Sequence, residues 1–224
     1  MDFQINFSIE DLLNFDDLVS ISQNDNGRVH RYKLSLSELV NVLNRSTTTQ
    51  REEMPFLPNN CFKLVKTNLG YEVYADVPKQ RWMINFNGNL FEVGFPRLLF
   101  RYDCIYQPKK KNYSVEITKI FALKGEEQVN GKTPLFAFPY SHVQSDGQVC
   151  MGGNKVKEIA NLVELENAHN IFLHSPFGTD WGAKTKLGKS CAELFSVVFN
   201  EKDFDEEVLN PVATFNELFA LGNE

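Results

Sequence analysis

The sequence lacks the features that would place the protein in a membrane, on a nucleic acid or outside the cell. No apolar run approaches the ~18 residues that a membrane-spanning helix needs. Lys and Arg number 23 against 29 Asp and Glu, which gives a net charge of −6, whereas binding phosphates requires clustered cations. The first residues, MDFQINFSIEDLL, carry acids where a secretory signal needs positive charge and a continuous apolar stretch. We therefore expect a cytoplasmic protein that binds neither membranes nor nucleic acids.

Cysteine is scarce, and its spacing excludes a disulfide framework. The four cysteines, Cys61, Cys104, Cys150 and Cys191, lie far apart and form no CxxC pair, so they are expected to be free thiols in a reducing compartment. Cys61, Cys104 and Cys191 fall within apolar strand or helix patterns, where a cysteine acts as a small buried side chain. Only Cys150 lies in a polar loop, which makes it the candidate for chemistry.

Two short motifs are weak signals for phosphate binding. The basic run Lys109–Lys111 is typical of a solvated loop between strands. Residues 125–133, GEEQVNGKT, approach a P-loop, but five residues separate the glycines where the motif has four. The apolar stretch 134–139 that follows, with a proline at each end, cannot open the helix whose N-terminus would hold a phosphate. Nucleotide binding is therefore not expected.

The apolar periodicity predicts an α+β fold. Between residues 60 and 123, six short alternating runs are joined by tight turns, a pattern typical of an antiparallel β-meander. After Cys150 the spacing becomes helical, so we expect one antiparallel sheet with C-terminal helices covering one face. The predicted strands are residues 61–67, 71–77, 81–86, 89–95, 98–106 and 113–123, and the predicted helices are residues 155–165, 191–199 and 214–222.

The N-terminal part is expected to be a separate β/α extension. Residues 3–9 alternate apolar and polar side chains as a half-buried strand does, and residues 37–43 indicate a short capped helix. The polar stretch 46–53, followed by prolines, is the best candidate boundary in the chain. We therefore predict an extension of residues 1–55 (a strand and a short helix) and a main domain of residues 56–224.

The segment 133–153 presents Cys150 in a way that suits a nucleophile. An apolar strand ends at Pro139, a polar loop with a turn at residues 145–147 follows, and Cys150 comes just before Gly152 and Gly153. The loop would keep the thiol partly exposed, the glycines would allow a substrate backbone to approach, and a nearby helix N-terminus would favour the thiolate.

Three side chains of the same loop, Tyr140, His142 and Asp146, lie within reach of this thiol in sequence. The competing interpretation of Cys150 is a small buried hydrophobe without reactivity.

Residues 140–150, YSHVQSDGQVC, resemble the His-Pro-Asn…Gly-x-Ile-Cys signature of ubiquitin-conjugating enzymes. The span to the cysteine is the same, and Gly147 stands three positions before Cys150. The wider block is similar to a bacterial branch, the PRTRC system protein B family (prokaryotic ubiquitin-conjugating-like family D). The resemblance covers residues 60–222 and implies the ubiquitin-conjugating fold. The matching blocks are Ala122-Leu123, Thr133-Pro134-Leu135-Phe136, Pro139-Tyr140, Val143, Asp146-Gly147, Val149-Cys150, Gly152 and Phe172…Ser175-x-Phe177.

The chain departs from this family pattern at two positions. His142 stands where the family has an Asn, whose amide helps to hold the active-site loop and to stabilise the oxyanion. An imidazole can donate one hydrogen bond or act as a base. The family also carries a His in a Phe-Thr-His element after the cysteine, but residues 177–180 here are Phe-Gly-Thr-Asp. His174, three residues before Phe177, is the candidate substitute.

The resemblance implies that Cys150 accepts a ubiquitin-like protein as a thioester from a ThiF-type activating enzyme and passes it to an amine. This step requires no metal and no cofactor. One alternative is an inactive binding module with the same fold, since the site departs from the family pattern. Another is a cysteine hydrolase that pairs Cys150 with His142 or His174 and with Asp146 or Asp180. A hydrolase is disfavoured because its cysteine usually opens a long helix early in the domain.

Overall fold

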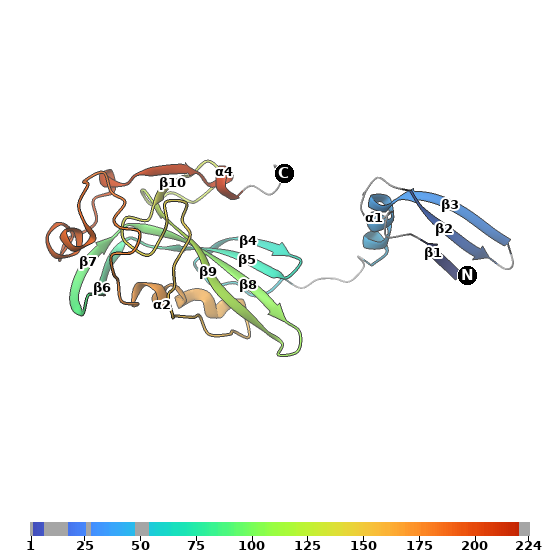
Figure 1. Cartoon of the computed structure of the whole chain (residues 1–224), viewed down its shortest axis with the longest axis horizontal. Coiled ribbons are helices and arrows are strands. Elements are labelled where there is room, and N and C mark those ends of the chain that lie inside the picture. The colour runs from blue at the N-terminus through green and yellow to red at the C-terminus, as the bar shows by residue number, and fades with distance from the viewer. Residues whose placement is uncertain (1, 7–17, 26–27, 48–53, 220–224) are drawn as a thin grey trace. The chain divides into compact units, whose positions relative to one another are not determined.

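The computed structural model describes residues 2–6, 18–25, 28–47 and 54–219. The chain divides into two compact units, residues 1–54 and 55–224 (Figure 1). Residues 7–9 of the predicted first strand and residues 220–222 of the predicted last helix lie outside the described residues. Among the described residues, no helix is long and apolar enough to cross a membrane.

The N-terminal unit is a three-stranded antiparallel sheet followed by one helix. Strands β1 (Asp2–Asn6), β2 (Leu18–Asp25) and β3 (Arg28–Ser35) pair in that order. Helix α1 (Leu36–Thr47) follows β3 directly, and the side chain of Glu38 in its first turn accepts the Ser35 N–H at 2.9 Å. Buried side chains of β2 and α1 form a small core, consisting of Val19, Ile21 and Leu39.

The C-terminal unit is built on a six-stranded antiparallel sheet in the order β11-β10-β9-β8-β5-β4, which confirms the predicted α+β class with an antiparallel sheet. Each of the six predicted runs lies within one of the strands β4 to β9. The runs do not form an uninterrupted meander, because β6 (Gln80–Phe86) and β7 (Asn89–Phe95) pair only with each other and β5 pairs with β8. The sheet strands are β4 (Cys61–Thr67), β5 (Gly70–Val77), β8 (Arg97–Gln107), β9 (Asn112–Leu123), β10 (Pro134–Ala137) and β11 (Pro211–Thr214).

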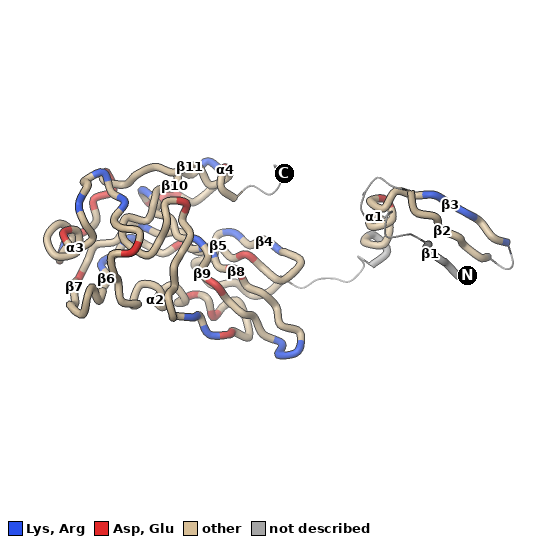
Figure 2. Tube along the Cα trace, in the orientation of Figure 1, with Lys and Arg blue, Asp and Glu red and all other residues tan. Residues whose placement is uncertain are grey.

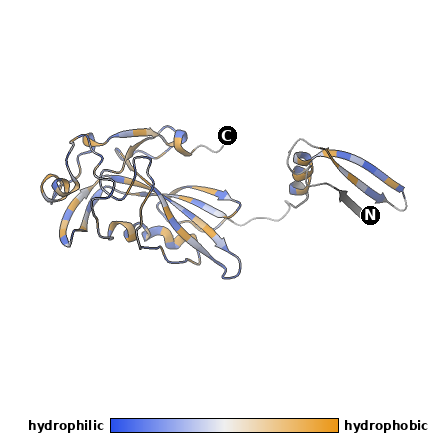
Figure 3. Ribbon diagram, viewed as in Figure 1, coloured by the Kyte–Doolittle hydropathy of each residue, from blue (hydrophilic) through white to orange (hydrophobic). Residues whose placement is uncertain are grey.

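Both faces of the sheet are covered, because apolar side chains alternate along strands that are buried on both sides. Val73 and Ala75 of β5 belong to the larger core, whereas Tyr74 between them belongs to a second core. Helix α2 (His169–Leu173) packs its Phe172 into the larger core, and helix α4 (Phe215–Phe219) packs into the second. Figure 1 shows α2 and α4 on opposite sides of the sheet, and Figure 3 shows the mixed hydropathy along the strands.

The helices are shorter than the sequence predicts. The predicted helix 155–165 begins only with a 3₁₀-helix at Leu162–Asn167, because the Glu164 carboxylate accepts the Ala160 and Asn161 N–H groups and caps the chain there. The predicted helix 191–199 consists of one α-turn, α3 (Cys191–Glu193), and a π-helix, η3 (Leu194–Val198). A further 3₁₀-helix, Glu206–Val208, precedes β11.

The basic run Lys109–Lys111 forms the exposed tip of the β8–β9 hairpin, as the sequence predicts (Figure 2). Lys110 pairs there with Glu158 at 2.5 Å, and its neighbours are exposed. Residues 109–111 therefore form an exposed loop between two strands.

Candidate functional site

Cys150 lies at the end of a narrow β-hairpin in the segment after β10. Val143 pairs with Val149 in antiparallel orientation, and the Gln144 N–H donates to the Gln148 carbonyl at 2.8 Å. The Cys150 N–H then donates to the His142 carbonyl at 2.8 Å. The main chain of Cys150 is therefore hydrogen-bonded directly to that of His142.

This hairpin is attached to the edge of β9 by main-chain and side-chain bonds. The Ile120 N–H donates to the Gly147 carbonyl at 3.0 Å, and the Val149 N–H donates to the Thr118 carbonyl at 3.4 Å. Lys119 contacts Asp146 twice, at 2.9 Å to the carboxylate and at 3.0 Å to the carbonyl. The hairpin thus continues the sheet beside β9.

The predicted loop residue Asp146 holds the turn of the hairpin. Besides its ion pair with Lys119, its carboxylate accepts the Gln148 N–H at 3.0 Å. These two contacts, the one with Lys119 first, lower the pKa of Asp146 from its ordinary value. Asp146 is therefore an ionised residue whose hydrogen bonds are used within the turn.

Gly147 is required by geometry. Its φ of +83° is in the left-handed region, and a Cβ atom at this position would lie 2.4 Å from the ring of Phe121. Any other residue would combine backbone strain with a clash against a buried aromatic ring. Gly152, with φ of +55°, has no atom within 4 Å of its Cβ position, and both it and Gly153 are exposed.

Tyr140 is fully buried in an aromatic cluster. Its ring centroid lies 4.7 Å from that of Phe95 and 4.8 Å from that of Phe195, and its hydroxyl donates to the Gly94 carbonyl. Burial raises the pKa of Tyr140 well above its ordinary value, so the hydroxyl stays protonated. Tyr140 therefore anchors the start of the hairpin in the core.

His142 joins the hairpin to the loop at residues 177–182. Its N–H donates to the Asp180 carbonyl at 3.0 Å, and its Nε2 atom accepts the Gly178 N–H at 2.8 Å. Nδ1 lies 3.8 Å from the Asp180 carboxylate, and the ring contacts Phe177 with a centroid distance of 5.7 Å. The backbone φ is +67°, a conformation in which His and Asn are enriched among non-glycine residues.

The imidazole of His142 is neutral at pH 7. Burial lowers its pKa from the ordinary value, against opposing contributions from the Asp180 carboxylate and the Pro176 carbonyl. Because Nε2 accepts a hydrogen bond, the proton of the neutral ring is assigned to Nδ1, which faces Asp180. The Nε2 lone pair is thus already engaged in holding the loop at Gly178.

His174 lies apart from this arrangement. It ends helix α2, is exposed, and stacks edge-on against Trp82 of β6 at a centroid distance of 5.8 Å. Within the described part of the chain, no hydrogen bond or ring contact connects His174 to residues 140–150. The structure therefore does not bring the two predicted histidines together around the thiol.

The four cysteines differ in their surroundings. Cys104 is 2% exposed and Cys191 is 3% exposed, and burial raises the pKa of both thiols, that of Cys104 to about 12. Cys61 is half-buried against the larger core, its thiol donates to the Lys63 carbonyl at 3.4 Å, and burial raises its pKa as well. Cys150 is half-buried and is followed by a half-buried Met151 and two exposed glycines.

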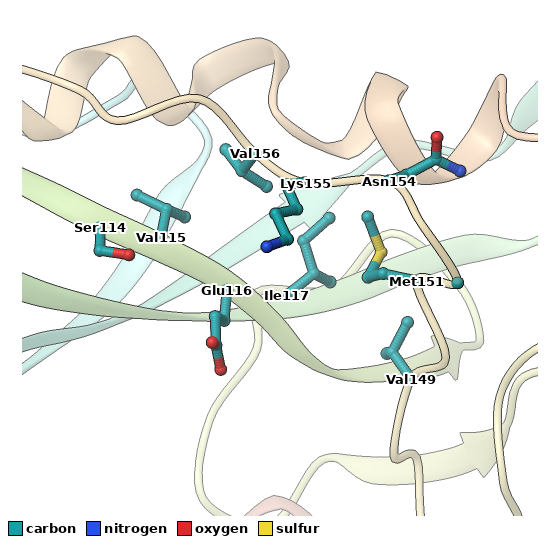
Figure 4. Close-up of a pocket in the computed structure, with 10 residues that line it drawn as sticks. Ser114, Val115, Glu116, Ile117, Val149, Met151, Asn154, Lys155 and Val156 are labelled. Carbon is teal, nitrogen blue, oxygen red and sulfur yellow. The ribbon is translucent and has the colours of Figure 1, made fainter.

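A groove of about 380 Å³ borders the Cys150 segment. One wall is residues 114–117 of β9, and the other is formed by Val149 and Met151, on either side of Cys150, with Gly152 and residues 154–156 (Figure 4). We call it the β9 groove. Its lining includes both sequence neighbours of Cys150 but not Cys150 itself.

Sequence reasoning missed the partners that hold the site. Lys119 is a charged residue within an otherwise apolar part of β9, a signal that it has a specific partner, but the identity of that partner depends on tertiary structure. The Gly178 N–H and the Asp180 carbonyl carry no signal in the sequence, because they act through the main chain. Lys155 at the β9 groove was expected within a helix.

The comparison with protein families agrees with this architecture. The family model of prokaryotic E2 family D matches residues 35–212. The chain belongs to this family, whose members are bacterial relatives of ubiquitin-conjugating (E2) enzymes. The match begins at Ser35, just before α1, and ends within β11, so it includes part of the N-terminal unit as well as the sheet and the Cys150 hairpin. No curated protein and no solved structure matches the chain.

Proposed function

We propose that Cys150 is the acyl-carrying cysteine of an E2-like transferase. The Cys150 thiolate attacks the carbonyl carbon of a thioester between a ubiquitin-like protein and its activating enzyme. A new carbon–sulfur bond forms, the old one breaks, and the thiolate of the activating enzyme leaves. An amine then attacks the Cys150 thioester, a carbon–nitrogen bond replaces the carbon–sulfur bond, and the amine releases a proton to solvent.

The placement of Cys150 is the observation that carries this proposal. It is a half-buried thiol at the end of a hairpin whose main chain is bonded to β9 and to His142. The other three thiols are buried, or are hydrogen-bonded with a raised pKa. A thiol held by main-chain hydrogen bonds next to exposed glycines suits attack on a large acyl group, because it is positioned and can be approached.

In this proposal His142 is a positioning residue. Its Nε2 atom holds the Gly178 N–H, so the lone pair that a general base would use is already engaged. The carbonyl oxygen of an asparagine side chain can accept the same bond, and asparagine tolerates the same positive φ. His142 is thus expected to replace the loop-holding role of the family's asparagine. Its Nδ1–H remains as a hydrogen-bond donor beside Asp180.

The partners proposed are a ThiF-type activating enzyme and a small ubiquitin-like protein. Membership in prokaryotic E2 family D supports a role in a bacterial conjugation system. The resemblance to PRTRC system protein B supports placement in a cassette of that type, in the cytoplasm. The acceptor is an amine of a protein or of a small molecule.

A catalytically inactive E2-like binding module is the second candidate. It is favoured by one observation: His142 is engaged with Gly178, and His174 is located at Trp82, so neither predicted histidine is free to act as a base at the thiol. The same observation argues against a cysteine hydrolase, which needs an imidazole in contact with its cysteine.

A charging assay tests the proposal. The protein is incubated with a ThiF-type activating enzyme and ubiquitin-like protein from the same genome and with ATP, then analysed on non-reducing gels and by mass spectrometry. We expect a reducible adduct that is absent in Cys150→Ala and persists as an ester in Cys150→Ser. Cys61→Ala, which removes the other half-buried thiol, is the matched control and should charge normally. A charged activating enzyme without transfer to this protein would favour the binding module.

A further inference from the structure

The edge of β9 that faces away from β8 is paired at both ends and, in the part of the chain that the structure describes, unpaired at residues 114–117 between them. At one end, Tyr113 exchanges two main-chain bonds with Ile159, at 2.8 and 3.0 Å. At the other end, residues 147–149 of the Cys150 hairpin bond to residues 118–120, and β10 pairs beyond them. Between these contacts no strand of the described chain pairs with residues 114–117 on this edge, and these residues form one wall of the β9 groove.

The gap exists because the chain after Cys150 leaves the sheet. Gln148 is opposite Lys119 in antiparallel orientation. A regular antiparallel strand would then bring Asn154 opposite Tyr113, but Ile159 occupies that position. The chain between Cys150 and Ile159 therefore has additional residues, and this segment, which we call the arch, passes over the edge of β9. Gly152 to Lys155 of the arch are exposed. The β9 groove, about 380 Å³ in volume, lies between the arch and the strand (Figure 4).

The main chain of β9 in the groove is oriented for one more strand. Both polar groups of Tyr113 bond to Ile159, so they point away from β8. The direction of the main-chain N–H and C=O groups alternates from residue to residue along a strand. The N–H and C=O groups of Val115 and the N–H of Ile117 therefore also point away from β8, into the groove. In a parallel pair, one residue of the added strand donates to the Val115 carbonyl and accepts the Ile117 N–H.

We infer that the β9 groove binds the extended C-terminal segment of the ubiquitin-like protein as an added parallel strand that ends at Cys150. This inference rests on the proposed function. An open strand edge selects extended main chain. Val149 and Met151, the two sequence neighbours of Cys150, line the groove together with Ile117, whereas Cys150 itself is not a lining residue. A chain that pairs with Ile117 therefore ends beside the Cys150 segment. Parallel orientation places the carboxyl end of the segment there.

The groove also limits the side chains of its occupant. The gap of four β9 residues spans ~13 Å, and the walls are apolar at Val115, Ile117, Val149 and Val156. A volume of about 380 Å³ therefore admits only a few small residues such as Gly and Ala.

Lys155 provides the charge that suits a C-terminal carboxylate. Figure 4 shows its side chain extending from the arch towards β9, with the Glu116 carboxylate turned away. Within the described part of the chain, Lys155 has no ion pair or hydrogen bond. Its ammonium group can therefore pair with the free carboxylate of the unactivated segment, which is the form that a peptide probe carries. The thioester that the activating enzyme delivers has no such charge.

A peptide experiment tests the groove without any activating enzyme. The probe is acetyl-Ala-Ala-Ala-Gly-Gly with a free carboxylate, added at millimolar concentration to the full-length Cys150→Ala protein labelled with ¹⁵N. We expect the amide signals of Val115 and Ile117 to shift. N-methylation should weaken binding at least tenfold at the one peptide residue whose N–H donates to the Val115 carbonyl, and should leave binding unchanged at the residues on either side of it.

Two variants of the arch test the role of Lys155. Lys155→Glu should weaken binding of the free-carboxylate peptide at least threefold, and should leave binding of the C-terminally amidated peptide unchanged. Lys157→Glu is the matched control, because Lys157 is exposed on the same segment but does not line the groove.

The outcomes separate the groove from the proposed function. If Val115 and Ile117 do not respond to the peptide while Cys150 charges normally, the groove proposal is overturned and the transferase stands. Equal weakening by N-methyl groups at neighbouring peptide residues would overturn strand addition. A single sensitive residue in the N-methyl series, together with a Cys150 that is never charged, would support strand addition in the groove and overturn the acyl-carrier role.

Discussion

Two neighbouring stretches of the β9 edge are completed in different ways. Residues 118–120 are covered by the Cys150 hairpin, in which the turn is held by Asp146, Lys119 and a glycine packed on Phe121. Residues 114–117 are left open under the arch that begins at Cys150. Cys150 therefore lies at the boundary between a hairpin that is hydrogen-bonded to β9 and an exposed segment that is not.

The largest difference in stability between the two stretches is expected when a glycine of each is replaced by alanine, Gly147 in the hairpin and Gly152 in the arch. In Gly147→Ala the strain of a positive φ, ~1–2 kcal/mol, adds to overpacking against Phe121, ~1–3 kcal/mol. We expect a loss of about 3 kcal/mol in the free energy of unfolding, measured by urea denaturation. Gly152→Ala has a positive φ but open space, so it should lose only about 1 kcal/mol. Equal losses would show that the Gly147 contact with Phe121 is not a constraint.

The second effect concerns the support that His142 gives to the Gly178 loop. His142→Ala leaves the Gly178 N–H without its acceptor and should cost ~1–3 kcal/mol of stability in urea unfolding. His142→Asn keeps an oxygen acceptor and should lose less than half as much. If the two variants are equally destabilised, the Gly178 hydrogen bond does not account for the role of His142.

The same contact has a pH dependence with a defined sign. Burial lowers the folded-state pKa of His142, so its contribution to stability is fully present above the unfolded-state pKa, ~6.5, and is lost as pH falls below it. His169, whose pKa is also lowered by burial, acts in the same direction. The difference between wild type and His142→Asn isolates the His142 contribution. We expect wild type to lose more stability than the variant between pH 7.5 and pH 5.

A smaller effect is expected from Asp146. Asp146→Ala removes the bond to the Gln148 N–H and the pair with Lys119, and should cost ~1 kcal/mol. Asp146→Asn retains an oxygen for Gln148 and should recover part of this loss. The contribution of the ion pair with Lys119 is measured by thermal unfolding at low and high salt, since an exposed ion pair is screened by salt. If Asp146→Asn loses as much stability as Asp146→Ala and the loss does not change with salt, the contribution of Asp146 does not come from these two contacts.

The smallest effect is expected on the open stretch. Lys155→Ala should change the free energy of unfolding by less than ~0.5 kcal/mol, because this exposed side chain has no partner within the described part of the chain. Denaturation in urea, with Lys157→Ala as reference, provides the comparison. A loss as large as that of Asp146→Ala would indicate that the arch is as tightly held as the hairpin.

The sequence alone determined the strands and the candidate thiol. Alternation with period two reflects burial on a pleated surface, a local property of the chain, so the predicted runs between residues 61 and 123 coincide with strands β4 to β9. Gly147 and Cys150 could be singled out because turn chemistry and polar context are written in neighbouring residues.

The tertiary structure decided which edges meet and what each polar group does. That β5 pairs with β8, that Lys119 contacts Asp146 and that His142 holds Gly178 depend on contacts between residues far apart in the chain. The helical spacing of residues 155–165 was overridden, because the Glu164 cap starts the helix late and the arch stays outside the sheet. The open edge of β9 follows from the departure of the chain from the sheet between Cys150 and Ile159, which no local pattern encodes.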